Sequence, residues 1–126
     1  MKKELTLKKC SNCGAFVKVI KDCNCNNCGI KCCDDEMMLV KSNSTDAAFE
    51  KHVPTYERKN GKLIVSVNHV MEKEHYIEWI CLITNEREEY RYFKPNDQAV
   101  CEFEDASEGI IYSYCNKHSL WQTSIE

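Results

Sequence analysis

The sequence predicts an all-β protein in two parts, a small metal-bound unit followed by a larger antiparallel β-sandwich or barrel. Two observations support this prediction. Seven of the ten cysteines lie between residues 10 and 33, where few apolar residues accompany them. From residue 49 onward, stretches rich in β-branched and aromatic residues recur about every ten residues between turn residues, which is typical of sandwiches and barrels.

Size and charge narrow the range of functions. A chain of 126 residues is long enough for one domain with its own core and a small appendage. The net charge of −3 provides no basic field for nucleic acid, and no apolar run reaches the ~18 residues of a membrane span. The start, MKKELTLKKC, lacks the apolar region of a secretory signal. We therefore expect a cytoplasmic protein with reduced thiols and no nucleic-acid or membrane partner.

Residues 1–40 are expected to form a metal-binding domain. They contain CSNC, CNCNNC and CC, together with two short strand-like stretches, AFVKVI at 15–20 and EMMLV at 36–40. So few apolar residues cannot fold alone. Thiolates bind iron and zinc strongly, so a bound metal would supply the missing stability.

Residues 41–126 are assigned to the second domain, whose first part, 41–48, is small and polar and indicates a linker. Asn60-Gly61 is a strong hairpin signal. Cys81 and Cys101 fall inside predicted strands and are interpreted as core cysteines, with Cys81 on the same face as Ile77, Trp79 and Ile83. The strands expected here are 62–69, 76–84, 89–93, 99–104 and 109–115.

All four histidines lie at a strand end or in a loop. Each one alone would more often be a surface or core residue than a ligand. As a set they are informative, because His69 and His75 bracket one short loop and His118 lies three residues after Cys115. Four imidazoles and one thiolate exceed the four ligands of structural zinc and suit iron with an open sixth position. The thiolate would push electron density onto the metal.

These motifs resemble the superoxide reductase family. FEKHVP, the pair His69 and His75 followed by YIEWI, and the closing YCNKHSLW occur in the family's order. The N-terminal CSNCG and CC resemble its two-iron branch, desulfoferrodoxin. The resemblance extends from Cys10 to Trp121. It implies an immunoglobulin-like seven-stranded antiparallel β-sandwich, usually dimeric, with a desulforedoxin-like N-terminal domain.

The resemblance also implies two mononuclear, non-haem iron sites and two catalytic residues. Glu50 would occupy the sixth position of the oxidised iron, and Lys51 would draw in the anion and help to protonate the product. The catalytic iron would be bound by His52, His69, His75 and His118 as equatorial ligands and by Cys115 as the axial thiolate. The N-terminal iron would be bound by Cys10, Cys13, Cys32 and Cys33, a tetrahedron that zinc also accepts.

The implied activity is superoxide reductase, an oxidoreductase of oxidative stress defence. It reduces superoxide by one electron to hydrogen peroxide, takes up two protons and releases no dioxygen. Rubredoxin or a similar carrier would return the electron. Two other interpretations stay open: an electron carrier centred on the four-thiolate iron, and a structural zinc protein. Because the chain is net negative, attraction of superoxide must be local, which favours a role for Lys51.

The sequence departs from the family pattern in two places. Val70 follows His69 where the family usually has proline, so the loop lacks a restraint on φ. The segment DCNCNNCGIK looks inserted and contains a second CxxC, which competes with Cys32-Cys33 as the second ligand pair. We favour Cys32-Cys33, because CCDDEM aligns with the family's CC-x-x-x-M. The three further thiols are Cys23, Cys25 and Cys28.

Overall fold

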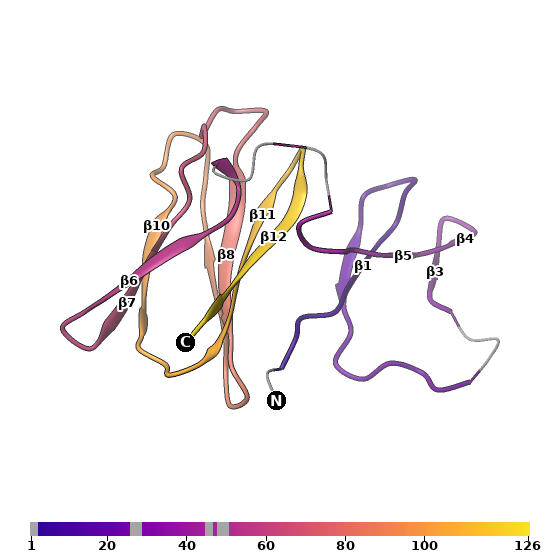
Figure 1. Ribbon diagram of the computed structural model, residues 1–126. Helices are drawn as coiled ribbons and strands as arrows, with labels where there is room; N and C mark the ends of the chain where they lie inside the picture. Colours follow the sequence, from indigo (N-terminus) through magenta and orange to yellow (C-terminus); the bar gives the residue numbers. More distant parts are fainter. Residues whose placement is uncertain (1–2, 26–28, 45–46, 48–50) are drawn as a thin grey trace. The chain divides into compact units, whose positions relative to one another are not determined.

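The computed structural model describes residues 3–25, 29–44, 47 and 51–126, and the chain divides into two compact units (Figure 1). One unit holds Leu5–Lys41, and the other holds Ser42–Glu126 with the start of the chain up to Glu4. Every named element in the described ranges is a β-strand, which confirms the all-β prediction. No helix in these ranges has the length and apolar character needed to cross a membrane.

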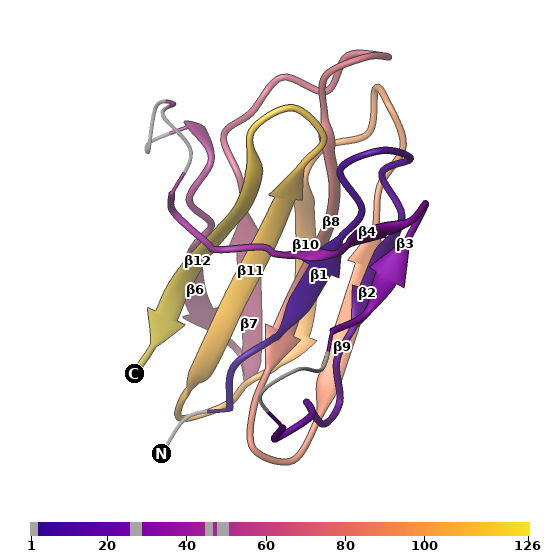
Figure 2. The same cartoon turned by 90° about the vertical axis from the view of Figure 1, so that its right-hand side faces the viewer.

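The larger unit is a sandwich of two antiparallel sheets, seen as two layers in Figure 2. Three and four strands give the seven-stranded, immunoglobulin-like arrangement that the family resemblance implied. The three-stranded sheet has the order β10 (Val100–Glu104), β7 (Lys62–Ser66), β6 (Thr55–Lys59). The four-stranded sheet has the order β12 (Ser119–Ile125), β11 (Gly109–Cys115), β8 (Ile77–Ile83), β9 (Glu88–Tyr92).

Alternating apolar residues from both sheets fill the core between them. Leu63 and Val65 of β7 face inward, and each is fully buried. Ile80, Leu82 and Ile111 come from the opposite sheet and join the same cluster. Full burial of one such side chain contributes about 1.5–3 kcal/mol. The sandwich therefore has its own source of stability and can present loops from a rigid frame.

The hairpin at Asn60-Gly61 matches its sequence signal. Both residues have positive φ, 54° and 77°, and Lys59 pairs with Lys62 across the turn. Two consecutive left-handed residues are what a type I′ turn requires, and the Asn-Gly pair adopts them readily. The turn joins β6 to β7.

A register shift between β8 and β11 changes which residues face the core. Tyr114 pairs with Trp79, whereas Cys115 pairs with Ile77, so one residue of β8 is skipped. Ile77 therefore belongs to the core cluster together with Cys115, and the prediction that it shares a face with Cys81 is wrong. Such bulges redirect side chains at strand ends. Here the bulge lies directly beside the Cys115 thiol.

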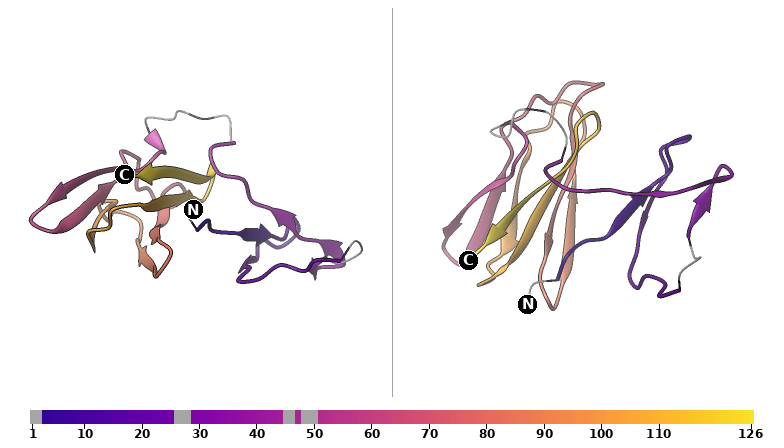
Figure 3. Two further views of the ribbon diagram at one scale, coloured as in Figure 1. Left: turned by 60° about the horizontal axis from the view of Figure 1, so that its bottom comes forward. Right: turned by 45° about the vertical axis from the view of Figure 1, so that its right-hand side comes forward.

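The smaller unit is built from short strands (Figure 3), and it buries few apolar side chains. Its buried apolar side chains among the described residues are Leu7, Cys10 and Met37. The predicted strand within 15–20 is present, but 36–40 is divided between two strands at the buried Met37. One sheet has the order β2 (Phe16–Lys18), β1 (Leu7–Lys9), β5 (Met38–Leu39), and a hairpin joins β3 (Lys31–Cys32) to β4 (Asp35–Glu36).

The start of the predicted linker is tied to the sandwich. The Asn43 side chain accepts a hydrogen bond from the Gln122 backbone N–H at 2.8 Å and donates one to the Gln122 carbonyl at 3.4 Å. The Asn43 backbone N–H donates to the Leu120 carbonyl at 2.9 Å. Asn43 thus acts as an extra link to β12. Residues 45–46 and 48 of the predicted linker lie outside the described residues.

Candidate metal centres

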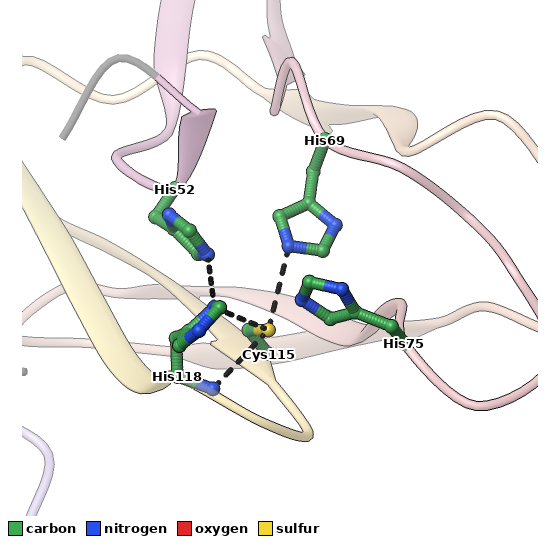
Figure 4. A group of neighbouring side chains, drawn as sticks. All are labelled: His52, His69, His75, Cys115 and His118. Atoms are coloured by element: carbon green, nitrogen blue, oxygen red, sulfur yellow. Dashed lines mark hydrogen bonds between the residues drawn. The ribbon is translucent and has the colours of Figure 1, made fainter. Parts of the chain in front are cut away.

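Four histidines and one cysteine, far apart in sequence, meet at one end of the sandwich (Figure 4). One ligand atom from each residue lies within 4.8 Å of those of all the others. They come from the segment before β6, the β7–β8 loop, the end of β11 and the β11–β12 turn. The five residues are His52, His69, His75, Cys115 and His118.

The four imidazoles form a closed ring. The ring centroids of His52 lie 4.7 Å from those of both His69 and His118. Those of His75 lie 4.6 Å from His69 and 5.0 Å from His118. Neighbouring planes are steeply inclined, at 71–90°. Each ring therefore has two neighbours at similar distances, which is the arrangement of four ligands around a square.

The donor-atom distances suit a single bound ion. Nε2 of His52 lies 2.9 Å from Nδ1 of His118. Two nitrogens bound to one metal at about 2.1 Å each, at right angles, would be about 3 Å apart. The Cys115 Sγ atom lies 3.4 Å from Nε2 of His69 and 3.9 Å from Nδ1 of His118. Cys115 thus contacts two rings of the square and completes a five-donor set.

Backbone and indole contacts fix the orientation of three ligands. Nδ1 of His69 contacts the Val70 carbonyl, which can only accept, so Nδ1 carries the hydrogen and Nε2 is left as a donor atom for a metal. Trp121 is fully buried, stacks on His52 at 4.9 Å, and donates from Nε1 to the His118 carbonyl at 2.9 Å. The His118 backbone N–H donates to the Cys115 Sγ at 3.3 Å.

Asn116 holds the loop on both sides of His75. Its Oδ1 accepts from the Tyr76 N–H at 3.0 Å, and its Nδ2 donates to the Glu74 carbonyl at 3.0 Å. The Asn116 N–H also donates to the Tyr76 carbonyl at 3.2 Å. No role for Asn116 was predicted from the sequence. Its position inside the CNKH motif was the available signal.

The loop that carries His69 and His75 is ordered without the family's proline. Met71 packs against the core cluster, and its Sδ accepts from the Ile77 N–H at 3.4 Å. Glu72 and His75 exchange backbone hydrogen bonds at 3.0 and 3.1 Å. Val70 is 48% exposed. The side chain at position 70 therefore points away from the core, and its neighbours hold the loop.

The neutral imidazoles of this site and a buried nitrogen without a hydrogen-bond partner are consistent with a bound cation. Burial lowers the pKa of both His69 and His75, so both rings are neutral and have a lone pair at neutral pH. Burial raises the pKa of the Cys115 thiol, and the backbone N–H groups of Lys117 and His118 oppose that shift. Within the described residues, Nε2 of His75 is buried and has no hydrogen-bond partner. A metal ion would satisfy it.

Of the two predicted catalytic residues, the structure describes Lys51 but not Glu50. Lys51 is exposed and directly precedes the buried His52. The backbone carbonyl of His52 accepts a hydrogen bond from the buried Ser113 hydroxyl at 2.9 Å. This bond links the segment that contains Lys51 and His52 to β11. Glu50 lies outside the described residues.

A second group of donors lies in the smaller unit and consists of four thiols within 4.8 Å of one another: Cys10, Cys13, Cys32 and Cys33. Cys13 Sγ lies 3.6 Å from Cys32 Sγ, which lies 3.9 Å from Cys33 Sγ. Sulfurs at the corners of a tetrahedron with metal–sulfur bonds of about 2.3 Å would be about 3.8 Å apart. The distances therefore match a tetrahedral thiolate site.

The turns that carry these thiols are shaped to present them. Cys33 and Asp34 have positive φ, 54° and 65°, in the two-residue turn between β3 and β4. Asp tolerates the left-handed region, but Cys33 is strained there, and no glycine marks this turn in the sequence. In the other turn, the Cys13 N–H donates to Cys10 Sγ at 3.4 Å, and Gly14 has a φ of 80°.

The close packing of the four thiols shifts their pKa values. Hydrogen bonding from the Cys13 backbone lowers the pKa of Cys10 to about 7. Hydrogen bonds involving Cys10 and Cys13 raise the pKa of Cys32 to about 12. Thiols this close cannot all ionise without a cation between them. Neither Cys23 nor Cys25 belongs to this group, and Cys28 lies outside the described residues.

Comparison of the sequence with known proteins shows similarity to desulfoferrodoxins. Residues 44–124 match the Desulfoferrodoxin family model. The desulfoferrodoxin of Clostridium acetobutylicum is 34% identical over 99% of this chain and all of that protein. A desulfoferrodoxin homologue of Archaeoglobus fulgidus is 37% identical over 98% of this chain and 99% of its own length.

Solved structures give the same picture of the fold. The superoxide reductase of Treponema pallidum superposes with a TM-score of 0.71 at 24% identity, covering 96% of this chain and 99% of its own. The superoxide reductase of Giardia intestinalis, described as a one-iron form, superposes with a TM-score of 0.55 at 26% identity, covering 61% of this chain and 98% of its own.

Proposed function

The chain belongs to the desulfoferrodoxin family, and from this premise we propose that it is a superoxide reductase whose catalytic iron binds at the ring of four imidazoles. The reaction is one-electron reduction of superoxide to hydrogen peroxide with uptake of two protons. The observation that carries the proposal is the closed square of imidazole rings with the Cys115 thiol in contact with two of them. The similarity to the Giardia superoxide reductase supports it.

The donor set fits iron. His52, His69, His75 and His118 would supply nitrogen ligands to the ion, and Cys115 would supply a thiolate. A ferrous ion held in this way supplies one electron to superoxide, and the thiolate makes that electron easier to give. Trp121, Asn116 and the Val70 carbonyl keep the rings oriented so that little rearrangement accompanies binding.

Lys51 is proposed to act on the substrate. Lys51 is exposed and directly precedes His52 in the chain, so its ammonium group provides a local positive charge on a chain with a net charge of −3. The group attracts the superoxide anion, and Nζ can donate one of the protons that the product needs. Glu50 is proposed as the carboxylate that takes the sixth position in the oxidised protein.

The smaller unit is proposed to hold a second iron through Cys10, Cys13, Cys32 and Cys33 and to relay electrons, although zinc accepts the same tetrahedron. We assign residues 1–40 to this domain and 41–126 to the catalytic domain. A rubredoxin-like carrier is the proposed electron donor. Homodimers and a cytoplasmic location complete the proposal and follow from the family resemblance and the many thiols.

The test compares the protein with Cys115→Ser and with a matched control, Cys101→Ser. Cys101 lies in β10, and burial raises its pKa to about 12, so it serves as a thiol outside the site. Iron content, superoxide consumption and dioxygen release are measured. We expect Cys115→Ser to lose the thiolate-to-iron absorption band and the activity, and Cys101→Ser to keep both. Equal activity in Cys115→Ser, or dioxygen release by the parent protein, would contradict the proposal.

A further inference from the structure

Four aromatic side chains form a continuous row on the face of the four-stranded sheet opposite to the core cluster. We call Tyr114, Trp79, Tyr90 and Tyr92 the aromatic row. Tyr114 and Trp79 are cross-strand partners on β11 and β8, and Trp79 pairs with Tyr92 of β9. The row therefore runs across three adjacent strands of the sheet.

The rings are close enough for direct contact along the whole row. Tyr114 and Trp79 stack, with centroids 5.6 Å apart and planes 15° apart. Trp79 meets Tyr90 edge-on at 5.7 Å. Tyr90 and Tyr92 stack at 6.2 Å with planes 15° apart. These separations are within the usual range of interacting aromatic pairs.

The two ends of the row have different surroundings. Tyr114 directly precedes Cys115, so the inner end is one peptide bond from the proposed axial thiolate. Tyr92 at the outer end is 74% exposed. Trp and Tyr are the side chains whose rings can lose one electron and pass the vacancy to a neighbour. The row thus begins at the residue that precedes Cys115 in the chain, on the opposite face of the sheet from the Cys115 side chain, and ends at an exposed tyrosine.

We propose that the aromatic row carries oxidising equivalents away from the iron site to Tyr92, where reductants in solution can quench them. This inference rests on the proposed function, because it requires iron at the site. Hydrogen peroxide, the product of the proposed reaction, would meet a ferrous ion beside the Cys115 thiolate once the electron donor has re-reduced the site. A second reaction of peroxide there would damage Cys115 and the imidazoles.

The protective step is the reduction of hydrogen peroxide to water. Reduction of one hydrogen peroxide to two waters breaks the O–O bond and consumes two electrons and two protons. Iron held by the five ligands would supply one of these electrons. The row gives the other, and the vacancy moves through Tyr114, Trp79 and Tyr90 to Tyr92. The Tyr92 phenol loses its proton to water and becomes a neutral radical, and solvent supplies the second proton. A soluble thiol then returns a hydrogen atom to Tyr92.

Packing alone offers a simpler account of these rings. Aromatic cross-strand pairs stabilise a sheet by about 0.5–1.5 kcal/mol beyond their buried area. Tyr92→Phe keeps the stacked ring and removes only the oxidisable phenol. This change therefore separates electron transfer from packing, and it is made at an exposed position where folding is not at risk.

The experiment uses the iron-loaded full chain and three variants: Tyr92→Phe, Trp79→Phe and the control Tyr56→Phe. Tyr56 lies on β6 of the other sheet and outside the row. Each reduced protein is mixed with one equivalent of hydrogen peroxide and frozen for electron paramagnetic resonance. Peptide mass spectrometry then measures oxidation of Cys115. Iron content and superoxide consumption are measured on the same samples.

We expect a tyrosyl radical in the parent protein and in Tyr56→Phe, and loss of that signal in Tyr92→Phe. Trp79→Phe should lower the radical yield several-fold and raise Cys115 oxidation several-fold. Superoxide consumption should be equal in all four proteins. Radical yield and Cys115 oxidation that do not depend on Tyr92 and Trp79, with superoxide still consumed, would overturn the inference. Absence of iron or of superoxide consumption in the parent protein would instead refute the proposed function.

Discussion

Replacement of Asn116 by alanine should loosen His75 without disturbing the core. The carboxamide of Asn116 makes two hydrogen bonds to the backbone on either side of this histidine, to the Tyr76 N–H and to the Glu74 carbonyl, both at 3.0 Å. Alanine removes both and leaves the rest of the β11–β12 turn in place. Asn116 is partly exposed, so water can replace part of what is lost.

The expected magnitude follows from these two bonds. Each contributes about 0.5–1.5 kcal/mol net, and partial exposure places the sum near the lower half of the range, at about 1–2 kcal/mol. If that free energy is what keeps His75 in position for the metal, then iron affinity should fall by roughly 5- to 30-fold. Unfolding of the metal-free protein should become easier by a similar amount.

The assay combines urea unfolding of the metal-free protein with competition for ferrous iron against a chelator. Asn43→Ala is the matched control, because the Asn43 side chain also bonds one backbone N–H and one carbonyl, both on Gln122. It should lower stability at least as much and leave iron affinity unchanged. Equal iron affinity in Asn116→Ala and the parent protein would refute the positioning role.

Three further predictions concern the charge, the protons and the thiols of the two centres. Lys51→Met should slow the second-order reaction with superoxide by roughly tenfold and reduce its dependence on salt, whereas Lys59→Met should not; identical salt dependence in both would remove local steering. The metal-free protein should lose thermal stability as the pH falls from 7 to 5. Burial lowers the pKa of His69 and His75, so below ~6.5 the unfolded chain binds protons that the folded chain does not; a flat midpoint over this range would contradict the burial of these rings. Cys32→Ser should reduce bound metal from two ions per chain to one, and Cys25→Ser should leave two; the opposite result would assign the second ligand pair to the CxxC of the inserted-looking loop.

The sequence predicted the histidine cluster because each member lies in a recognisable motif. His69 and His75 flank a short loop, and His118 follows Cys115 by three residues. Local spacing brings such pairs together whatever the rest of the chain does. Asn116 and Trp121 were missed because their roles depend on contacts between loops from different strands. Such contacts exist only once the sandwich has formed.

The strands show the same division between local and long-range information. Residues 109–115 were predicted as a strand and form β11 with those bounds, since the run is rich in β-branched and aromatic residues. The face of Ile77 was predicted incorrectly, because the register shift opposite Cys115 interrupts the alternation of β8. The left-handed Cys33 was also missed, because a non-glycine residue at that position has no turn signature.

The measurement that tests the central claim most directly is an anomalous difference map of the iron-loaded crystal, recorded at the iron absorption edge. The account predicts one peak inside the square of His52, His69, His75 and His118, about 2.1 Å from each nitrogen and about 2.3 Å from the Cys115 sulfur. A peak elsewhere in the sandwich, or one bound by the rings without Cys115, would contradict it.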